Sequence, residues 1–248
     1  MKVVAIIHAR MGSSRLPGKV MKTLGGDTVL AQVVKRVRNC SLLDEIVVAT
    51  TDGADDIAIV AEAERLGLAS FRGSADDVLA RYCGAAQMAD ADVVVRVTSD
   101  CPVFDGFLLQ EMLAEFTARR ESSQPCDYLS NSLERTYPRG LDAEIFSRAA
   151  LDEAGARATE RYEREHVTPY IYHHPEKFRL CHFKAGKDLS ELRWTLDTPE
   201  DYRFLAEVFA RLGRGGTLFG TTQVLALLDA HPELVEINRQ IRQKELRD

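Results

Sequence analysis

The stretch that decides the fold is an apolar run followed by a basic loop, residues 3–19, which read VVAIIHARMGSSRLPGK. Residues 3–7 are continuously apolar and rich in Val and Ile, as expected for a strand of a parallel sheet that is covered on both faces. The loop that follows contains two glycines, two serines and the cations Arg10, Arg15 and Lys19. Backbone N–H groups of Gly and Ser can face an anion, and Arg and Lys can bind phosphate oxygens. The stretch therefore predicts a phosphate-binding loop at the end of a buried strand.

The loop also has a structural interpretation. It matches neither the pattern G-x-x-x-x-G-K-[ST] nor the pattern G-x-G-x-x-G, so a P-loop or a dinucleotide site is disfavoured. Composition alone makes a solvated basic turn as good an interpretation as a phosphate site. Ligands of α/β folds bind beyond the carboxyl ends of the strands. The position of the loop after the first strand therefore favours the phosphate site.

Further along the chain, Val-rich runs and helical patterns alternate. The runs lie at residues 45–50 and 92–97, and apolar residues with helical spacing lie at residues 28–38, 55–67 and 76–89. This alternation predicts an α/β fold in which helices cover both faces of a mostly parallel sheet. The loops after the three apolar runs are therefore the first place to look for a site.

The composition is that of an ordinary soluble domain. The 248 residues carry 32 Lys and Arg against 38 Asp and Glu, a formal net charge of −6, and 45% of them are hydrophobic. These values exclude disordered, collagen-like and coiled-coil chains. The negative charge argues against a general nucleic-acid or anionic-membrane binder. Five widely spaced cysteines without a C-x-x-C pair predict reduced thiols, and no apolar run approaches a membrane span. We therefore expect a cytoplasmic protein that binds neither nucleic acid nor membrane.

A single domain is expected over residues 1–248, because an α/β domain of this length is ordinary. Loop signals indicate an inserted arm at about residues 121–165, which we interpret as a small subdomain or a dimerisation segment. Helical patterns at residues 200–213 and 221–246 predict terminal helices. His231-Pro232 interrupts the second of these patterns.

Several longer strings extend the pattern of the basic loop along most of the chain. They are ATTD at 49–52, FRGS at 71–74, DVLARY at 77–82, RVTSDCP at 96–102, PRGLDAE at 138–144, EHVTPY at 165–170 and RWTLDTPED at 193–201. In order and spacing, these strings and ARMGSSRLPGK at 9–19 resemble the cytidylyltransferases that activate acidic sugars. That family includes the CMP-3-deoxy-manno-octulosonate and CMP-acylneuraminate synthetases, and the resemblance is greatest to its spore coat polysaccharide biosynthesis type.

The resemblance implies a fold, a reaction and a set of partners. The fold is Rossmann-like and three-layered, of the nucleotide-diphospho-sugar transferase type. The reaction transfers CMP from CTP to a sugar acid or related acceptor and releases pyrophosphate, in surface polysaccharide biosynthesis. Arg10 and Lys19 would hold the triphosphate. The other residues implied around the nucleotide are Ala9, Gly12, Ser13, Arg15, Thr50, Thr51 and Arg72. A homodimer that binds CTP and a small sugar-type acceptor is the implied assembly.

Two aspartates, Asp100 and Asp197, are implied as ligands of Mg²⁺ and as catalytic residues together with Arg10 and Lys19. Mg²⁺ prefers one or two carboxylates together with phosphate oxygens, and both aspartates follow the end of an expected strand. Each aspartate also has a structural interpretation. Asp100 can be a turn residue, and Asp197 can cap the helix that begins near Pro199. The two roles of Asp197 can coexist, because a carboxylate has several acceptor positions.

Other polar residues are weaker candidates. Arg139, Asp142 and Glu144 are interpreted either as contacts of the acceptor or as solvated turn charges. His8, where relatives commonly carry Pro or Gln, either lines the nucleotide site or is a hydrogen-bonded structural residue, and the structural interpretation is favoured. Arg81 lies on an expected helix and is interpreted as a solvated or ion-paired side chain.

Two alternatives to nucleotidyl transfer stay open. A glycosyltransferase of the same fold would consume a nucleotide-sugar, and Asp90-Ala91-Asp92 is a D-x-D string of the kind such enzymes use. Its place at the entry of a strand favours solvated charge instead. A non-catalytic nucleotide-binding homologue would bind CTP without turnover. Release of pyrophosphate separates nucleotidyl transfer from both alternatives.

Overall fold

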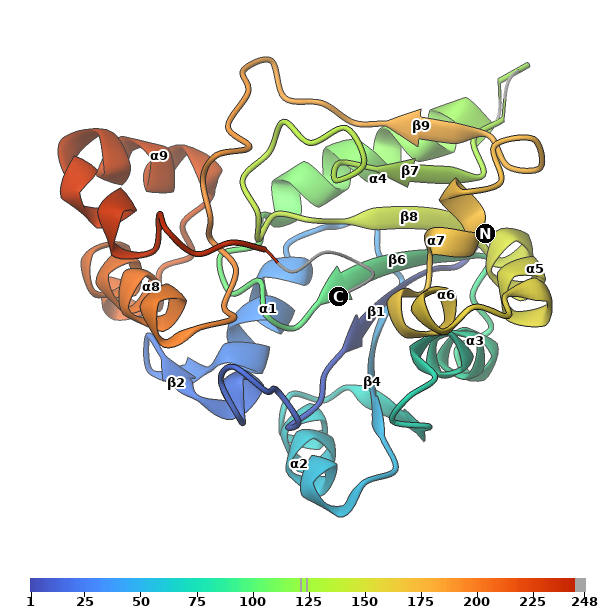
Figure 1. The fold of residues 1–248 in the computed structure, drawn as a ribbon, viewed down its shortest axis with the longest axis horizontal. Coiled ribbons are helices and arrows are strands. Elements are labelled where there is room, and N and C mark those ends of the chain that lie inside the picture. Colours follow the sequence, from blue (N-terminus) through green and yellow to red (C-terminus); the bar gives the residue numbers. More distant parts are fainter. Residues whose placement is uncertain (121, 124, 244–248) are drawn as a thin grey trace.

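The computed structural model describes residues 1–120, 122–123 and 125–243. Within these residues, a seven-stranded sheet of order β5-β4-β1-β6-β8-β7-β9 forms the centre of the molecule (Figure 1). Its strands are β1 (Val3–His8), β4 (Glu45–Thr51), β5 (Ala69–Gly73), β6 (Val93–Thr98), β7 (Tyr128–Ser130), β8 (Glu144–Ser147) and β9 (Leu180–His182). A separate two-stranded sheet consists of β2 (Thr23–Leu24) and β3 (Asp27–Thr28). The three Val-rich runs are thus confirmed as strands β1, β4 and β6.

Helices cover both faces of the central sheet. In the described part of the chain they are α1 (Val29–Val37), α2 (Ile57–Arg65), α3 (Val78–Met88), α4 (Gly106–Arg120), α5 (Arg148–Arg157), α6 (Arg161–His166), α7 (Pro169–Tyr172), α8 (Pro199–Leu212) and α9 (Thr221–Ala230). Strand β1 is buried on both sides: Val3, Ala5 and Ile7 pack in one core with α1, α4 and α8, and Val4 and Ile6 pack in a second core with α3, α5 and α7. The expected three-layer α/β fold is therefore confirmed.

Strand direction places the loops that matter at one edge of the sheet. β4 and β6 both pair in parallel with β1, and β5 pairs in parallel with β4. β8 pairs antiparallel with β6 and with β7, while β7 and β9 are parallel. Among the described strands of this sheet, β8 alone runs against the others. The mostly parallel sheet is confirmed, and the loops after β1, β4 and β6 leave from the same edge.

The segment that we expected as an inserted arm is integrated with the core. Its strands β7 and β8 belong to the central sheet, and α5 packs against α3. Tyr128 and Phe146 are buried side by side in the core on the α3 face. Residues 121 and 124, at the beginning of the segment, lie outside the described residues. A role in dimerisation stays a prediction.

The ends of the expected helices differ from the structure where proline and capping residues act. The pattern at 55–67 divides into a 3₁₀ turn, η2 (Ala54–Asp56), and α2. The expected helix at 221–246 is wrong beyond Ala230, where η4 (Pro232–Ile237) replaces it. Pro232 has no N–H to continue the helix, and it restricts the residue before it. Residues 244–246 of that expectation lie outside the described part.

The cysteines and the helix lengths complete the description. All five cysteines are free thiols; Cys40, Cys101 and Cys126 are buried, and Cys83 and Cys181 are half-buried. No helix of the described residues combines the length and the apolar character that a membrane crossing requires. The remaining short 3₁₀ helices are η1 (Lys19–Met21) and η3 (Arg214–Gly216).

Candidate active site

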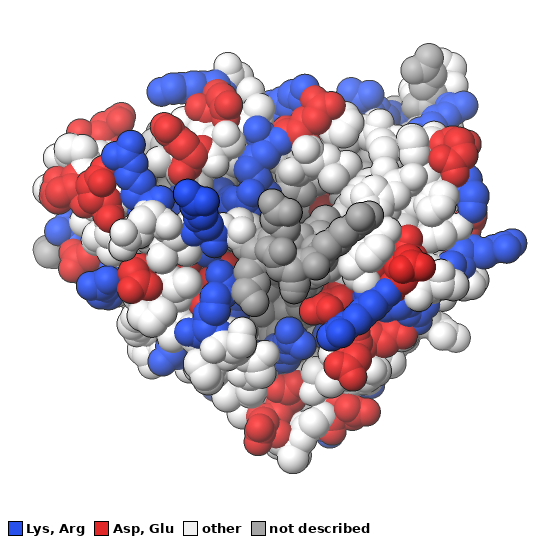
Figure 2. Space-filling model, viewed as in Figure 1, with Lys and Arg blue, Asp and Glu red and all other residues white. Residues whose placement is uncertain are grey.

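A cavity of about 500 Å³ lies where the loops after β1 and β6 meet the loop before α8. Figure 2 shows Lys and Arg side chains around the centre of the face viewed there. Seven of the expected site residues line the cavity: Arg10, Gly12, Ser13, Arg15, Lys19, Asp100 and Asp197. They come from three loops far apart in the sequence. The structure thus brings the basic loop and both aspartates together, as the resemblance implied.

The basic loop is closed by its own backbone and by one carboxylate. Ser13 N and Gly18 N both donate to Met11 O, at 2.9 and 3.0 Å. Gly18 has a φ of 65°, a left-handed conformation that glycine adopts without strain. Met11 N donates to Asp56 Oδ1 at 2.7 Å, which ties the loop to η2. This closure returns the chain to the sheet at Lys19.

The Lys19 ammonium lies between the two aspartates. Its Nζ donates to Asp100 Oδ2 at 2.7 Å, to Asp197 Oδ1 at 2.8 Å and to the carbonyl of Leu196 at 2.9 Å. Burial opposes the charge of Lys19, but the two carboxylates outweigh it, so the Lys19 pKa is raised. The Asp100 pKa is lowered, because the attraction of Lys19 outweighs the burial of the carboxyl group. In this structure Lys19 therefore binds carboxylates, and its contact with a triphosphate stays a prediction.

The structure separates the two interpretations of Asp197. Thr198 is the N-cap of α8, since its side chain accepts from Asp201 N. The Asp197 carboxylate is instead held by Arg15 Nη2 at 3.1 Å and Arg193 Nη2 at 3.0 Å, beside its bond to Lys19. The capping alternative for Asp197 is wrong, because the next residue does that work.

A buried network fixes Arg193 in turn. Arg193 Nε donates to Asp201 Oδ1 at 2.9 Å, and Asp201 is fully buried. Asn238 Nδ2, after η4, donates to Arg193 O at 3.0 Å and to Asp201 Oδ1 at 2.9 Å. The orientation of Asp197 thus depends on α8 and on residues close to the end of the described chain.

The arrangement fits Mg²⁺. Asp100 and Asp197 reach the same ammonium group, so their oxygens already converge on one cation position. Carboxylate oxygens are hard ligands, and Mg²⁺ commonly takes one or two of them and leaves the other positions to phosphates and water. No group of three or more His, Cys, Asp or Glu side chains that could hold a metal occurs in the described ranges. The two aspartates are therefore suited to share a metal with a phosphate ligand.

Four residues implied around the nucleotide do not line the cavity. Thr50 and Thr51 are buried, and the Thr51 hydroxyl donates to Asp56. Arg72 Nε donates to Thr51 O at 3.1 Å and Arg72 Nη2 to Gly53 O at 3.0 Å. Ala9 is buried and continues the pairing of β1, with its N–H on Ala49 O at 3.0 Å. Their expected side-chain contacts are corrected: these residues hold the loops around the cavity.

The weaker acceptor-side candidates are also engaged elsewhere. The Asp142 carboxylate pairs with Arg135, outside the cavity. Glu144 is buried and accepts from Arg96, from the Tyr128 hydroxyl and from the Thr168 hydroxyl. Arg139 lines a separate small cavity and pairs its backbone with Arg193. Neither interpretation of Glu144 is correct, because it is neither exposed nor free to meet an acceptor.

The neighbouring string PRGLDAE depends on its glycine. Gly140 has a φ of 107°, and a Cβ built there would lie 2.6 Å from the backbone carbon of Trp194. The close approach of these two backbones joins the loop before β8 to the strand-like segment that leads to Asp197.

Several residues that line the cavity were not expected as ligands. They are His8, Ser14, Val20, Val78, Arg81, Arg96, Ser99, Glu165, His166 and Gln243. Arg81 is buried, so its interpretation as a solvated or ion-paired side chain is wrong. His8 lines the cavity and is also hydrogen-bonded through Nδ1, 3.0 Å from the Tyr82 hydroxyl. The two interpretations of His8 thus hold together. The strings DVLARY and RVTSDCP carried the signal for Arg81 and Arg96.

Lowering the pH from 7 to 5 should destabilise the unsubstituted protein by about 2 kcal/mol more than the His8→Gln variant. Burial, and then the charge of Arg96, lower the His8 pKa to about 3. In the unfolded chain the pKa is about 6.5. Between these values the unfolded state binds a proton that the folded state does not, so the free energy of unfolding decreases as the pH falls. Urea denaturation of both proteins at several pH values measures the difference. The same pH dependence in both would contradict it.

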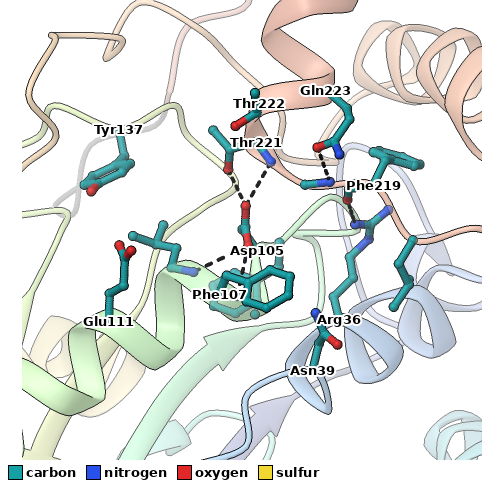
Figure 3. A pocket seen from close by; sticks show the side chains of 15 residues that line it. Arg36, Asn39, Asp105, Phe107, Glu111, Tyr137, Phe219, Thr221, Thr222 and Gln223 are labelled. Atoms are coloured by element: carbon teal, nitrogen blue, oxygen red, sulfur yellow. Dashed lines mark hydrogen bonds between the residues drawn. The ribbon is translucent and has the colours of Figure 1, made fainter.

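A second cavity, of about 430 Å³, lies between α1, α4 and α9 (Figure 3). Its central carboxylate, Asp105, accepts from Thr221 N at 2.9 Å, from the Thr221 hydroxyl at 2.7 Å and from Phe107 N at 3.0 Å. Arg36 Nη1 donates to Phe219 O at 2.5 Å, and its guanidinium lies 4.2 Å from the centre of the Phe219 ring. Asp105 and Arg36 join helices here, and none of the expected site residues lines this cavity.

Three known proteins resemble the chain. A cytidylyltransferase from Leptospira borgpetersenii has a TM-score of 0.89 and 32% sequence identity over 99% of this chain and 100% of its own. The spore coat polysaccharide biosynthesis protein SpsF of Bacillus subtilis is 32% identical over 93% of this chain and 95% of its own. A 3-deoxy-manno-octulosonate cytidylyltransferase of Anaeromyxobacter is 33% identical over 69% of this chain and 72% of its own. Fold and likeness together define a Rossmann-like nucleotidyltransferase.

The family can be stated more narrowly. The model of the family described as cytidylyltransferase matches residues 4–213, which include the basic loop and both aspartates. The chain belongs to the cytidylyltransferase family and is, by class, a CTP-dependent nucleotidyltransferase. The resemblance seen in the sequence is confirmed at the level of the family, and its relatives include proteins of polysaccharide biosynthesis.

Proposed function

We propose that this chain transfers CMP from CTP to the hydroxyl group of a sugar acid or related acceptor and releases pyrophosphate. The observation that carries the proposal is the convergence of Asp100, Asp197 and Lys19 beside the basic loop, within one cavity. Nucleotidyl transfer needs that combination, because it proceeds mainly by positioning the reacting groups and offsetting charge on phosphate oxygens.

The residues of the chain divide the work by charge. Arg10 has no ion-pair partner in the described ranges and lines the cavity, so it is available to the triphosphate. The backbone of Gly12 and Ser13 faces the same space. Asp100 and Asp197 would hold Mg²⁺, which supplies neutralisation of phosphate charge when bound. Lys19 must then release at least one carboxylate, and a phosphate oxygen is the natural new partner for its ammonium.

A pyrophosphate-release screen tests the proposal. The protein is incubated with Mg²⁺, with each of the four nucleoside triphosphates, and with a panel of keto-sugar acids and phosphorylated polyols. We expect pyrophosphate with CTP and one class of acceptor, and much less with UTP, ATP or GTP. Release of a nucleoside diphosphate from nucleotide-sugars would indicate the glycosyltransferase alternative, and CTP binding without turnover would indicate a non-catalytic homologue.

The D-x-D string gives the glycosyltransferase alternative no support. Asp92 accepts from Lys2 N at 2.6 Å, at the amino end of β6, whereas the cavity lies beyond its carboxyl end. Asp90 is exposed in a turn with a φ of 48°. The string is therefore solvated charge, as its position in the sequence favoured.

The remaining expectations belong to the same proposal. A homodimer rests on the resemblance to the family. A place in surface polysaccharide biosynthesis rests on the relative SpsF, whose name states that process. A cytoplasmic location fits the five free thiols, because a reducing compartment keeps thiols unpaired.

A further inference from the structure

One side of the cavity presents a histidine whose hydrogen-bonding role is fixed. His8 Nδ1 lies 3.0 Å from the Tyr82 hydroxyl, and that hydroxyl donates its one hydrogen to Ile6 O at 3.2 Å. Nδ1 must therefore carry the hydrogen of the neutral imidazole and donate it to the Tyr82 oxygen. Burial raises the Tyr82 pKa, so the hydroxyl keeps its hydrogen. Nε2 of His8 is left as a bare acceptor, and no partner for it occurs in the described part of the chain.

The same side of the cavity presents an arginine with unused donors. Arg81 is 1% exposed, and its Nη1 donates to the carbonyls of Ser74 and Ala75. Its Nε and Nη2 are buried and have no partner among the described residues. Buried polar groups are nearly always paired, so two orphaned donors on a permanently charged group need an explanation. Arg81 and Tyr82 are consecutive on α3, so one helix sets both the donor and the acceptor.

We propose that His8 and Arg81 read the Watson–Crick edge of the base and select cytosine over uracil. This inference rests on the proposed function, since it names what determines the choice of nucleotide. Cytosine offers an amino donor at N4 beside acceptors at N3 and O2. The amino group matches the lone pair of His8, and the ring acceptors match the free N–H groups of Arg81. Uracil reverses two of these positions: its O4 would meet the lone pair of His8, and its N3–H would meet a donor of Arg81.

The location of the pair supports a base contact. Both residues line the same cavity as Gly12 and Ser13 of the basic loop, beside the apolar side chain of Val78. Arg72, the residue expected near the base, has its guanidinium on the carbonyls of Thr51 and Gly53. A site that pairs each polar group of one ligand leaves groups unpaired with an analogue, and this is the usual source of strong discrimination.

Direct binding of CTP and UTP tests the pair without an acceptor. Both nucleotides are titrated calorimetrically into the full chain with Mg²⁺. In the His8→Leu variant we expect the ratio of CTP to UTP affinity to fall about tenfold, the value of one good base contact. His8→Gln should retain most of the preference, because its amide oxygen can accept. Tyr82→Phe should lower the ratio, although Tyr82 does not line the cavity, since it frees the tautomer of His8. His231→Leu, at an exposed histidine, is the matched control.

Arg81 is tested by a change that keeps its charge. Arg81→Lys removes the planar fork of donors and should also lower the ratio about tenfold. An unchanged ratio in folded His8→Leu and Arg81→Lys proteins, with CTP still bound, would overturn this inference and leave the proposed function standing. Should Arg81→Lys fail to fold, the His8→Leu result decides the inference. Failure of the unsubstituted protein to bind CTP would overturn both.

Discussion

The Asp100→Asn variant should release pyrophosphate from CTP about 100-fold more slowly than the unsubstituted protein, or worse. Asn keeps the shape of the side chain and removes its charge. The charge of Asp100 offsets Lys19 in the structure and is suited to a metal that shares phosphate oxygens. A group that stabilises charge in the transition state typically contributes a factor of about 100 or more. The measurement is the initial rate of pyrophosphate release at saturating Mg²⁺ and CTP.

The matched control is Asp90→Asn. It removes the same charge from the D-x-D string, in a turn with positive φ that asparagine tolerates. We expect an unchanged rate for this variant. A near-normal rate for folded Asp100→Asn would sink the assignment of Asp100. A large loss for Asp90→Asn would restore the D-x-D string as a functional motif.

The Lys19→Met variant should lose about 3 kcal/mol of unfolding free energy in the absence of Mg²⁺. Lys19 is the cation shared by Asp100 and Asp197, whose side chains are 25% and 11% exposed. Removing one partner of a buried ion pair costs about 3–5 kcal/mol, and partial exposure places this site at the low end. Two neighbouring carboxylates without a cation repel each other. Added Mg²⁺ should therefore restore part of the stability, since a ligand that binds only the folded state raises it.

Chemical denaturation with and without Mg²⁺ measures this effect. Lys184→Met is the matched control, because Lys184 is a half-exposed lysine paired with Glu134 at the surface, where such pairs contribute about 0–1 kcal/mol. A Lys19→Met protein as stable as the parent, or one that Mg²⁺ does not stabilise, would contradict the view that the two aspartates form a shared cation site.

The parts of the fold with local signals were predictable. Continuous Val and Ile runs gave the positions of β1, β4 and β6, and Gly, Ser and basic residues marked the loop after β1. Helix α4 carries a helical pattern of its own in Leu108, Leu109, Met112, Leu113 and Phe116, which the comparison of strings with the family did not use. The antiparallel direction of β8 has no local signal, because pairing partners are chosen in space.

The side-chain partners in the site were predictable only in part. Thr51 and Arg72 follow strands at the correct edge of the sheet, but Asp56 and two backbone carbonyls claim their polar groups. Lys19 is in the expected loop, and only the folded chain shows that both aspartates reach it. Glu144 illustrates the same point, since its partners Tyr128 and Thr168 come from β7 and the start of α7. Burial and long-range pairing decide such contacts, and one sequence does not record them.

The bond from Asn238 to Asp201 and Arg193 has a consequence for damage far from the cavity. Asn238 lies beyond residues 4–213, the stretch that the family shares. It nevertheless braces the arginine that orients Asp197. Shortening the chain by its last helical turns would leave the common scaffold of the family intact and still loosen one of the two carboxylates. The most variable end of such an enzyme can thus control the alignment of its least variable chemistry.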